Sequence, residues 1–177
     1  MTHRVEGCEL CEQTGGTPVW QDGACRVVRV DDADYPGFCR VIWHDHVAEM
    51  SDLTGTEQRH LMGVVNAVEA SLRKLYRPDK INLASLGNVV PHLHWHIIPR
   101  WRDDRHFPKP VWAVPERDKS APRPAVPDQT LRDAIVQVLA EAQGGGVCAT
   151  WRGAPRSGDR QQNGLADARP ATTTNQP

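Results

Sequence analysis

The sequence predicts an α+β fold, a five-stranded antiparallel sheet with one long helix packed on it. Five short stretches of apolar residues, each bounded by turn residues, are typical of strands. One longer stretch, residues 54–77, has apolar residues at helical spacing between a start signal and a stop signal. An Asp22-Gly23 turn between the first two strands indicates a hairpin, which makes that pair antiparallel. Together these observations favour a sheet with a helix on it over an all-helical domain.

The first three strands are expected at Thr17–Gln21, Cys25–Asp31 and Phe38–Trp43. Glycine tolerates the positive φ of a tight turn, so Asp22-Gly23 joins the first two strands directly. A polar loop rich in turn residues, 31–37, then leads into the third strand.

The long helix is expected to begin at Thr54, because Thr54 and Glu57 form a T-x-x-E capping box. Pro78 ends it, since proline cannot continue a helix. A fourth strand is expected at Lys80–Ala84 and a fifth at His92–Ile98. The apolar residues of the helix form one stripe, so we expect the helix to support the sheet. These residues are Leu61, Val64, Val65, Val68, Leu72 and Leu75.

The chain changes character after the fifth strand. Residues 1–113 are expected to form the catalytic domain, and residues 114–127 a connector rich in proline. Residues 128–143 have the pattern of a second amphipathic helix, with Asp128 as its N-cap. The tail, residues 144–177, has too few apolar residues to offset the entropy of ordering, so it is expected to be disordered.

Composition excludes several classes of function. The 177 residues suit one domain with an appendage, and a net charge of −1 gives no general argument for binding nucleic acid. No apolar run reaches the length of a membrane span, and the first residues lack an apolar signal core. We therefore expect a cytoplasmic protein with no membrane partner. Five cysteines in a reducing compartment do not indicate disulfides, and Cys25 and Cys39 are expected to be core thiols.

Three of the eight histidines, His92, His94 and His96, stand at alternate positions. In a strand they face one side, and the apolar residues between them face the other. One neutral imidazole can attack a phosphorus or acyl centre while its neighbours donate hydrogen bonds to an oxyanion or leaving group. Three ligands to one metal ion are the competing interpretation, although the outer Cα atoms would lie about 13 Å apart. A third interpretation is a loose, solvent-exposed histidine tract, which the apolar residues between the histidines disfavour.

Cys8 and Cys11 form a C-x-x-C pair near the N-terminus. That spacing suits two thiolates on one Zn²⁺, which then needs two more ligands. His44, His46 and His92 are available in expected strand-end positions. A thioredoxin-like redox pair is a competitor, but such motifs normally open a helix after a strand, and no strand is expected before this pair. Two free thiols are the remaining alternative.

The stretch His92–Ile98, His-Leu-His-Trp-His-Ile-Ile, resembles the signature of the histidine triad (HIT) family, His-φ-His-φ-His-φ-φ with φ apolar. The resemblance extends over about residues 5–112. It implies a nucleotide hydrolase or nucleotidyl transferase that acts on an α-phosphate. His94 would be the nucleophile that forms a nucleotidyl-histidine, and His96 would bind phosphate or the leaving group. As in zinc-bearing relatives, a structural zinc ion would be held by Cys8, Cys11, His46 and His92.

The resemblance also implies residues that touch the nucleotide. Asn88 stands where relatives carry a side chain that contacts phosphate, and Asp31 or Asp32 stands where an acidic residue holds the ribose. Typical members are homodimers whose sheets join, so a homodimer is expected. The other side chains expected to contact the nucleotide are Asn82, Arg100 and Trp112, with Arg102, Arg105 and His106 as candidates for extra phosphates.

The sequence departs from the family pattern at three places. Gly87-Asn88 replaces the usual Gly-Gln pair, and Trp43–His46 replaces Pro-x-x-His, so His44 competes with His46 as a ligand. Residues 100–112 do not match the ending of the phosphoramidase branch. The resemblance therefore favours hydrolysis of dinucleoside polyphosphates, such as diadenosine tetraphosphate. A purine nucleoside phosphoramidase, a nucleotide-binding sensor with little catalysis and a zinc-stabilised interaction domain are the alternatives.

Overall fold

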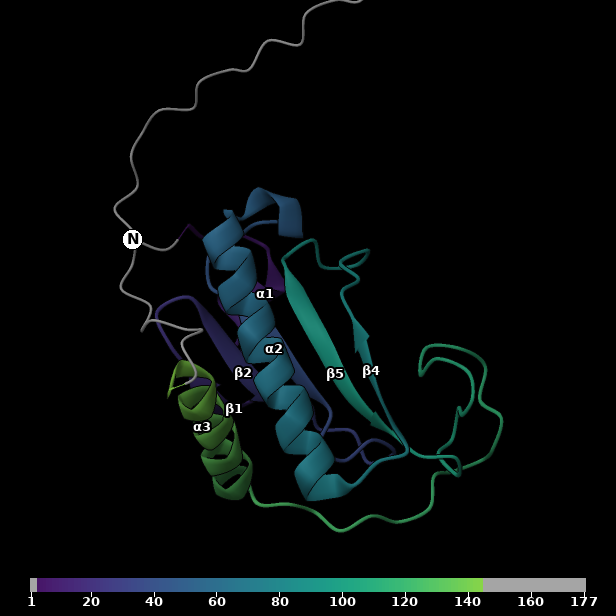
Figure 1. The fold of residues 1–177 in the computed structure, drawn as a ribbon. Coiled ribbons are helices and arrows are strands. Elements are labelled where there is room, and N and C mark those ends of the chain that lie inside the picture. The colour runs from purple at the N-terminus through teal and green to yellow at the C-terminus, as the bar shows by residue number, and fades with distance from the viewer. Residues whose placement is uncertain (1–2, 145–177) are drawn as a thin grey trace, which may run out of the picture.

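The computed structural model describes residues 3–144, and its centre is one sheet of five antiparallel strands in the order β1-β2-β3-β5-β4 (Figure 1). The α+β prediction is confirmed. The predicted tail, apart from Gly144, lies outside the described residues. The strands are β1 (Thr17–Gln21), β2 (Cys25–Arg29), β3 (Cys39–Trp43), β4 (Lys80–Ala84) and β5 (His94–Arg100).

The long helix α2 (Gly55–Tyr76) lies across one face of the sheet (Figure 1). The predicted capping box is present, because the Thr54 side chain accepts a hydrogen bond from the Glu57 backbone N–H while the Glu57 side chain accepts from the Thr54 N–H. Arg77 ends the helix in the left-handed conformation, directly before Pro78. The apolar stripe of α2 packs on inward-facing sheet residues such as Val41 and Ile97, which forms the main core.

A second helix, α3 (Asp128–Gly144), packs against α2 and β1 and completes this core. Leu131 and Ile135 on α3 are fully buried. The helix was predicted, but Asp128 has another role than the expected N-cap. Its carboxylate accepts hydrogen bonds from Arg29 Nε at 2.5 Å and Nη2 at 3.3 Å, so it fastens the start of α3 to β2.

The opposite face of the sheet is covered by the N-terminal segment and by the loop that follows β5. The N-terminal segment, with the short helix α1 (Glu9–Glu12), packs on Val28 and Ile42. Residues 101–127 run beyond β5 and β4 as a long loop (Figure 1). Neither α1 nor the 3₁₀ helix at Met50–Asp52 was predicted, because each is a single turn whose sequence has no helical period.

The largest difference from prediction is the start of β5, which begins at His94 and not at His92. The His92 N–H donates to the Val90 carbonyl at 2.8 Å, so a turn holds His92 just before the strand. Thus His92 does not share the strand face of His94 and His96. Within residues 3–144, no helix has the length and apolar character needed to cross a membrane.

Candidate functional site

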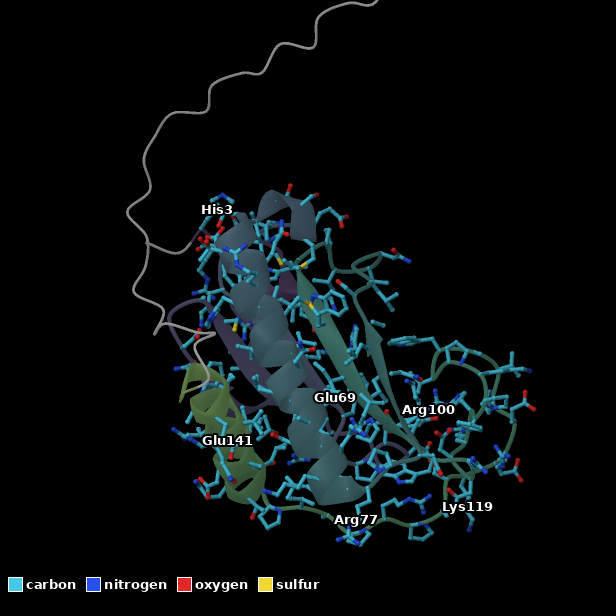
Figure 2. All side chains as sticks on the ribbon, viewed as in Figure 1. His3, Glu69, Arg77, Arg100, Lys119 and Glu141 are labelled. Carbon is cyan, nitrogen blue, oxygen red and sulfur yellow. The ribbon has the colours of Figure 1, made fainter. Side chains whose placement is uncertain are left out.

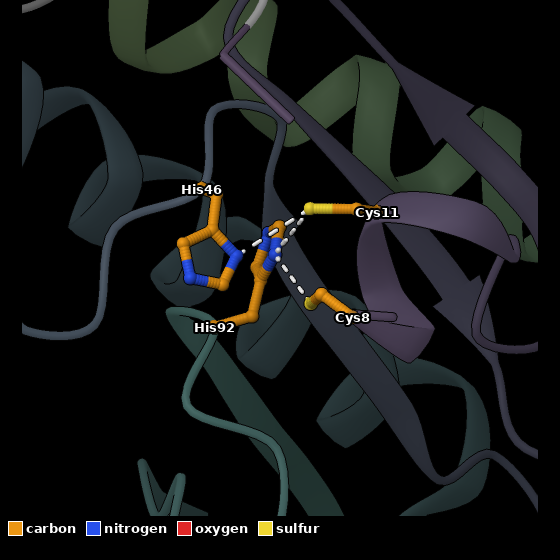
Figure 3. Close-up of side chains that lie close together, drawn as sticks. All are labelled: Cys8, Cys11, His46 and His92. Carbon is orange, nitrogen blue, oxygen red and sulfur yellow. Dashed lines mark hydrogen bonds between the residues drawn. The ribbon is translucent and has the colours of Figure 1, made fainter. Parts of the chain in front are cut away.

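Four side chains that could hold a metal ion, from three parts of the chain, meet beside the start of β5 (Figure 3). Cys8 and Cys11 come from the α1 segment, His46 from the chain after β3, and His92 from the turn before β5. His92 Nδ1 lies 3.5 Å from both sulfur atoms, and His46 Nδ1 lies 3.4 Å from Cys11 Sγ. All four ligand atoms lie within 4.8 Å of one another.

The hydrogen bonds of His92 leave the correct ring nitrogen free for a metal. Its Nε2 lies 2.7 Å from the Trp43 carbonyl, which only accepts, so Nε2 carries the proton and Nδ1 is bare. Burial lowers the pKa of His92, which favours the neutral ring that a metal requires. A backbone carbonyl that holds the second ring nitrogen is the usual outer support of a metal-binding histidine. Two thiols and two imidazoles at these separations fit a tetrahedral ion with bonds of about 2.0–2.3 Å.

The structure brings His46 and not His44 to this cluster. His44 Nε2 lies 3.0 Å from the Asp22 carbonyl, which directs the ring toward the β1–β2 turn. Cys8 and Cys11 are buried and carry free thiols. Cys25 and Cys39, predicted as core thiols, have no exposed surface, and burial raises the pKa of Cys39 to about 12.

A cleft of about 390 Å³ opens next to this cluster, on the sheet face away from α2. His94 and His96 form part of its floor, Trp112 closes one side, and the loop that contains Asn88 closes another. Such a volume lies within the range of sites for small ligands. Among the predicted site residues, the structure therefore brings together His94, His96, Asn88 and Trp112.

His94 has one ring nitrogen held and one free of the backbone. Its Nδ1 lies 2.6 Å from the carbonyl of His92, so Nδ1 carries the proton and Nε2 is the nitrogen with a lone pair. The Ser85 hydroxyl donates to the His94 carbonyl at 3.0 Å, which fixes the backbone at this point. Burial lowers the pKa of His94 and keeps the ring neutral. A neutral imidazole held this way is a competent nucleophile.

His96 lies beside His94, with ring centroids 4.7 Å apart. Its ring contacts Trp112 edge-on at 5.3 Å and Phe38 at 5.6 Å. Burial, followed by the charges of His94 and Arg40, lowers the pKa of His96 to about 4. Its Nδ1 is buried without a hydrogen-bond partner among the described residues. A buried polar atom without a protein partner is typical of a group that bonds to water or has a functional role.

Arg100 and Asn82, expected to contact the nucleotide, lie elsewhere and bond to each other. Arg100 Nη1 donates to Asn82 Oδ1 at 2.6 Å, and its Nε donates to the buried Asp104 at 2.7 Å. Figure 2 shows Arg100 where β5 passes into the long loop. Only 2% of Arg100 is exposed, so its charge is used inside the fold and not in the cleft.

The remaining expected contacts also lie outside the cleft. Asp31 and Asp32 line a second hollow of about 290 Å³ between the β2–β3 loop and the start of α3. Arg105 pairs with Asp34, and His106 Nδ1 lies 2.5 Å from the Tyr35 hydroxyl.

Two charged residues line the cleft that the sequence reasoning did not select, Glu9 and Arg40. Arg40 is the single charged residue of β3, a strand whose other four members are buried. A lone cation inside a buried strand was the signal that would have identified it.

Comparisons with known proteins agree with this geometry. The family model described as HIT domain matches residues 13–103. The AP-4-A phosphorylase of Mycobacterium tuberculosis is 31% identical over 78 residues, which are 41% of this chain and 40% of that relative. The bis(5'-adenosyl)-triphosphatase of Saccharomyces cerevisiae is 36% identical over 61 residues, 32% of this chain and 30% of that relative. The chain thus spans less than half the length of these curated relatives.

Among solved structures, a histidine triad (HIT) protein from Sinorhizobium meliloti superposes with a TM-score of 0.57 at 31% identity. The match covers 73% of this chain and 93% of that chain.

Proposed function

The chain belongs to the HIT domain family, and we propose that it cleaves a dinucleoside polyphosphate through a covalent nucleotidyl intermediate on His94. The observation that carries the proposal is the state of His94. Its Nδ1–H is held by the His92 carbonyl, so its Nε2 is left with a lone pair in a cleft of nucleotide size. The printed names of the two curated relatives support this substrate class.

The reaction has two steps. In the first, His94 Nε2 forms a bond to the α-phosphorus, and the bond from that phosphorus to the bridging oxygen breaks. The oxygen leaves with the electron pair on the departing nucleotide. In the second, water or inorganic phosphate attacks the phosphorus, the P–N bond breaks, and the electron pair returns to Nε2. When water is the acceptor, it loses one proton to solvent and its oxygen stays on the released nucleoside monophosphate. Throughout, the His92 carbonyl accepts from Nδ1–H and stabilises the positive charge on the ring.

The neighbours of His94 supply the remaining functions of this mechanism. His96 Nδ1 has no partner among the described residues, which supports a role as donor to a phosphate oxygen or to the leaving group. Trp112 is 52% exposed at the mouth of the cleft, which suits stacking on a base. Asn88 lines the cleft from the loop before β5, which supports a contact between its side chain and phosphate.

The decisive experiment is incubation of the protein with diadenosine polyphosphates and adenosine 5'-phosphoramidate, with products identified by mass. We expect release of a nucleoside monophosphate, or a diphosphate if inorganic phosphate is the acceptor. His94→Ala should lower turnover by at least about 10⁴-fold while nucleotide still binds. His44→Ala, outside the cleft, is the matched control and should retain activity. Undiminished turnover in His94→Ala would exclude the mechanism.

Two alternative functions give different results in the same experiment. A phosphoramidase would turn over the phosphoramidate faster than any polyphosphate. A nucleotide sensor would bind nucleotide in calorimetry and release no product. A nucleotidyl adduct of His94, seen by intact mass after rapid mixing, excludes the sensor.

We further propose that Cys8, Cys11, His46 and His92 hold one structural Zn²⁺. The donor set and the bare Nδ1 of His92 support the proposal. Bound zinc would tie α1 to β5, since α1 has only four residues and cannot be stable alone. The metal would therefore organise the wall of the cleft and take no part in the chemical step.

Metal analysis tests this zinc site. We expect about one zinc ion per chain by native mass spectrometry, and about none in Cys11→Ser. Chelation should lower the melting temperature of the wild type and leave that of Cys11→Ser unchanged. Cys39→Ala, in the core, should keep its zinc. A wild type purified without metal, and unaffected by added zinc, would contradict the proposal.

We also propose a homodimer that joins at the β4 edge of the sheet. Helix α3 packs on the other edge strand, β1, whereas β4 presents Leu83 at 40% exposure. An exposed strand edge favours pairing with a second copy. Light scattering after size exclusion should give twice the chain mass, and Leu83→Lys should give the monomer.

A further inference from the structure

Arg40 is a cation in the cleft that the proposed mechanism does not use. It lies on β3 directly opposite His96 on β5 and lines the same cleft as His94 and Trp112. Paired residues on antiparallel strands have Cβ atoms about 4.5–5.5 Å apart, so the guanidinium and the His96 ring share one part of the cleft floor.

The contacts of Arg40 inside the protein are incomplete. Its Nη1 donates to the Gly15 carbonyl at 3.1 Å, while its Nε is buried and has no partner among residues 3–144. Over the same part of the chain, no carboxylate forms an ion pair with it, although Glu9 lines the cleft nearby. Burial lowers the pKa of Arg40 more than the charge of Glu9 raises it, so the guanidinium is only partly compensated inside the fold and an anionic ligand would stabilise it.

Arg40 and His96 therefore line the cleft from neighbouring strands, and each side chain has one buried nitrogen without a hydrogen-bond partner among the described residues, Arg40 Nε and His96 Nδ1. Both can donate at once to a group with several acceptor oxygens. A phosphate has this property, and a guanidinium is the preferred side chain for binding it. The position of Arg40 and His96 also indicates which phosphate of the substrate they would bind. Arg40 pairs with His96 across the two strands, whereas His94 pairs with Ile42. An anion held between Arg40 and His96 therefore lies two residues along β5 from His94, which carries the attacking nitrogen.

We propose that Arg40 binds the phosphate next to the one attacked, so that it makes the site selective for polyphosphate substrates over nucleotides with one phosphate. This inference rests on the proposed function, because it assigns the α-phosphate to His94. The guanidinium neutralises the negative charge that the leaving phosphate gains when the bridging bond breaks. A phosphoramidate has an amine in that place, and Arg40 gains little there.

The test compares kcat/KM for diadenosine tetraphosphate and for adenosine 5'-phosphoramidate. Arg40→Gln keeps hydrogen-bonding capacity without charge and should lower the value for the tetraphosphate by about 100-fold. The value for the phosphoramidate should fall by less than about 5-fold. Arg40→Lys should restore part of the selectivity, because it restores the charge. Arg132→Gln, on the exposed surface of α3, is the matched control and should retain both values. Equal losses on the two substrates, or no loss, would overturn the inference.

A binding measurement separates this inference from the proposed function. Inorganic tripolyphosphate carries the charge without a nucleoside, so its affinity reports the phosphate site alone. We expect calorimetry to show binding to the wild type and at least about 10-fold weaker binding to Arg40→Gln. If the wild type turns over neither nucleotide, the proposed function fails, and this difference still decides the role of Arg40. Equal affinity in the two proteins would exclude Arg40 as a phosphate ligand. Melting temperatures of the Gln and Lys variants check that both are folded.

Discussion

His92 belongs to the Cys/His cluster and also contacts His94, the proposed nucleophile. Its ring faces the cysteines while its carbonyl accepts from His94 Nδ1. Because the Trp43 carbonyl fixes the ring, the position of the His92 backbone is fixed as well. The tautomer of His94 therefore depends on the same turn that completes the cluster. The different surroundings of the three alternate histidines follow from the start of β5 at His94.

Asp104 shows at the same scale how a buried pair organises the loop after β5. It is fully buried and accepts from Arg100 Nε at 2.7 Å and Nη2 at 3.0 Å, and also from the N–H groups of Trp101, His106 and Phe107. Burial alone would raise the pKa of Asp104, but these hydrogen bonds and the Arg100 charge lower it. The carboxylate is therefore ionised. It accepts hydrogen bonds from backbone N–H groups of the loop that backbone carbonyls would accept in a helix or strand.

We expect Asp104→Asn to lower the free energy of unfolding by about 3 kcal/mol, because it leaves the Arg100 charge buried without a partner. Urea unfolding monitored by tryptophan fluorescence measures the change. Asp118→Asn, on the exposed part of the same loop, should change the stability by less than about 0.5 kcal/mol. Equal stability of the two variants would show that the pair is not needed for folding.

At the scale of elements, periodicity decided what was predictable. Helix α2 and all five strands have a hydrophobic period, and the predicted ends of each element lie within two residues of the observed ends. Helix α1 has four residues and no period, so only its contacts with β2 and β3 determine it. Arg100 was expected in the cleft because its charge suits phosphate. Its partner Asp104 is close in the sequence, but the burial of the pair depends on the path of the whole loop.

Helix α3 was predicted from its apolar stripe, and its packing makes it part of the core and not an appendage. Ile135→Ala should lower the free energy of unfolding by about 3 kcal/mol, because it leaves a cavity against α2. Val136, one residue along, is 45% exposed, so Val136→Ala should cost less than about 1 kcal/mol. Denaturant unfolding compares the two. If α3 did not contribute to the stability of the core, Ile135→Ala would lower the free energy of unfolding no more than Val136→Ala does.

At the scale of the molecule, the two faces of the sheet have separate functions. One face packs on α2 and α3, and the other forms the floor of the cleft under α1 and the loops before and after β5. The alternation of the triad predicted one strand face for His94 and His96, and both side chains line the cleft from that face. It did not identify Arg40 or Glu9, because no motif names them and only the assembled walls bring them to the cleft.

The buried floor of the cleft makes the stability of the whole fold depend on pH. His96 has a pKa of about 4 in the fold against an ordinary value of 6.5, chiefly because burial disfavours its charged form. Between these values the unfolded chain binds a proton that the folded chain does not, so stability falls as pH falls through this window. Above pH 6.5 the ring is neutral in both states and contributes no slope. Below pH 4 it is protonated in both, and the loss is complete.

We expect His96 alone to lower the free energy of unfolding by about 2 kcal/mol between pH 6.5 and pH 4. This value is smaller than the difference between the two pKa values would give, because water reaches the cleft. Carboxylates such as Asp104 add their own acid dependence, so the effect is measured as a difference. His96→Asn cannot titrate, and its free energy of unfolding should fall less steeply than that of the wild type over this window. From pH 7 to 8.5 the difference between the two proteins should stay constant. Parallel curves down to pH 4 would show that His96 is not held neutral by the fold.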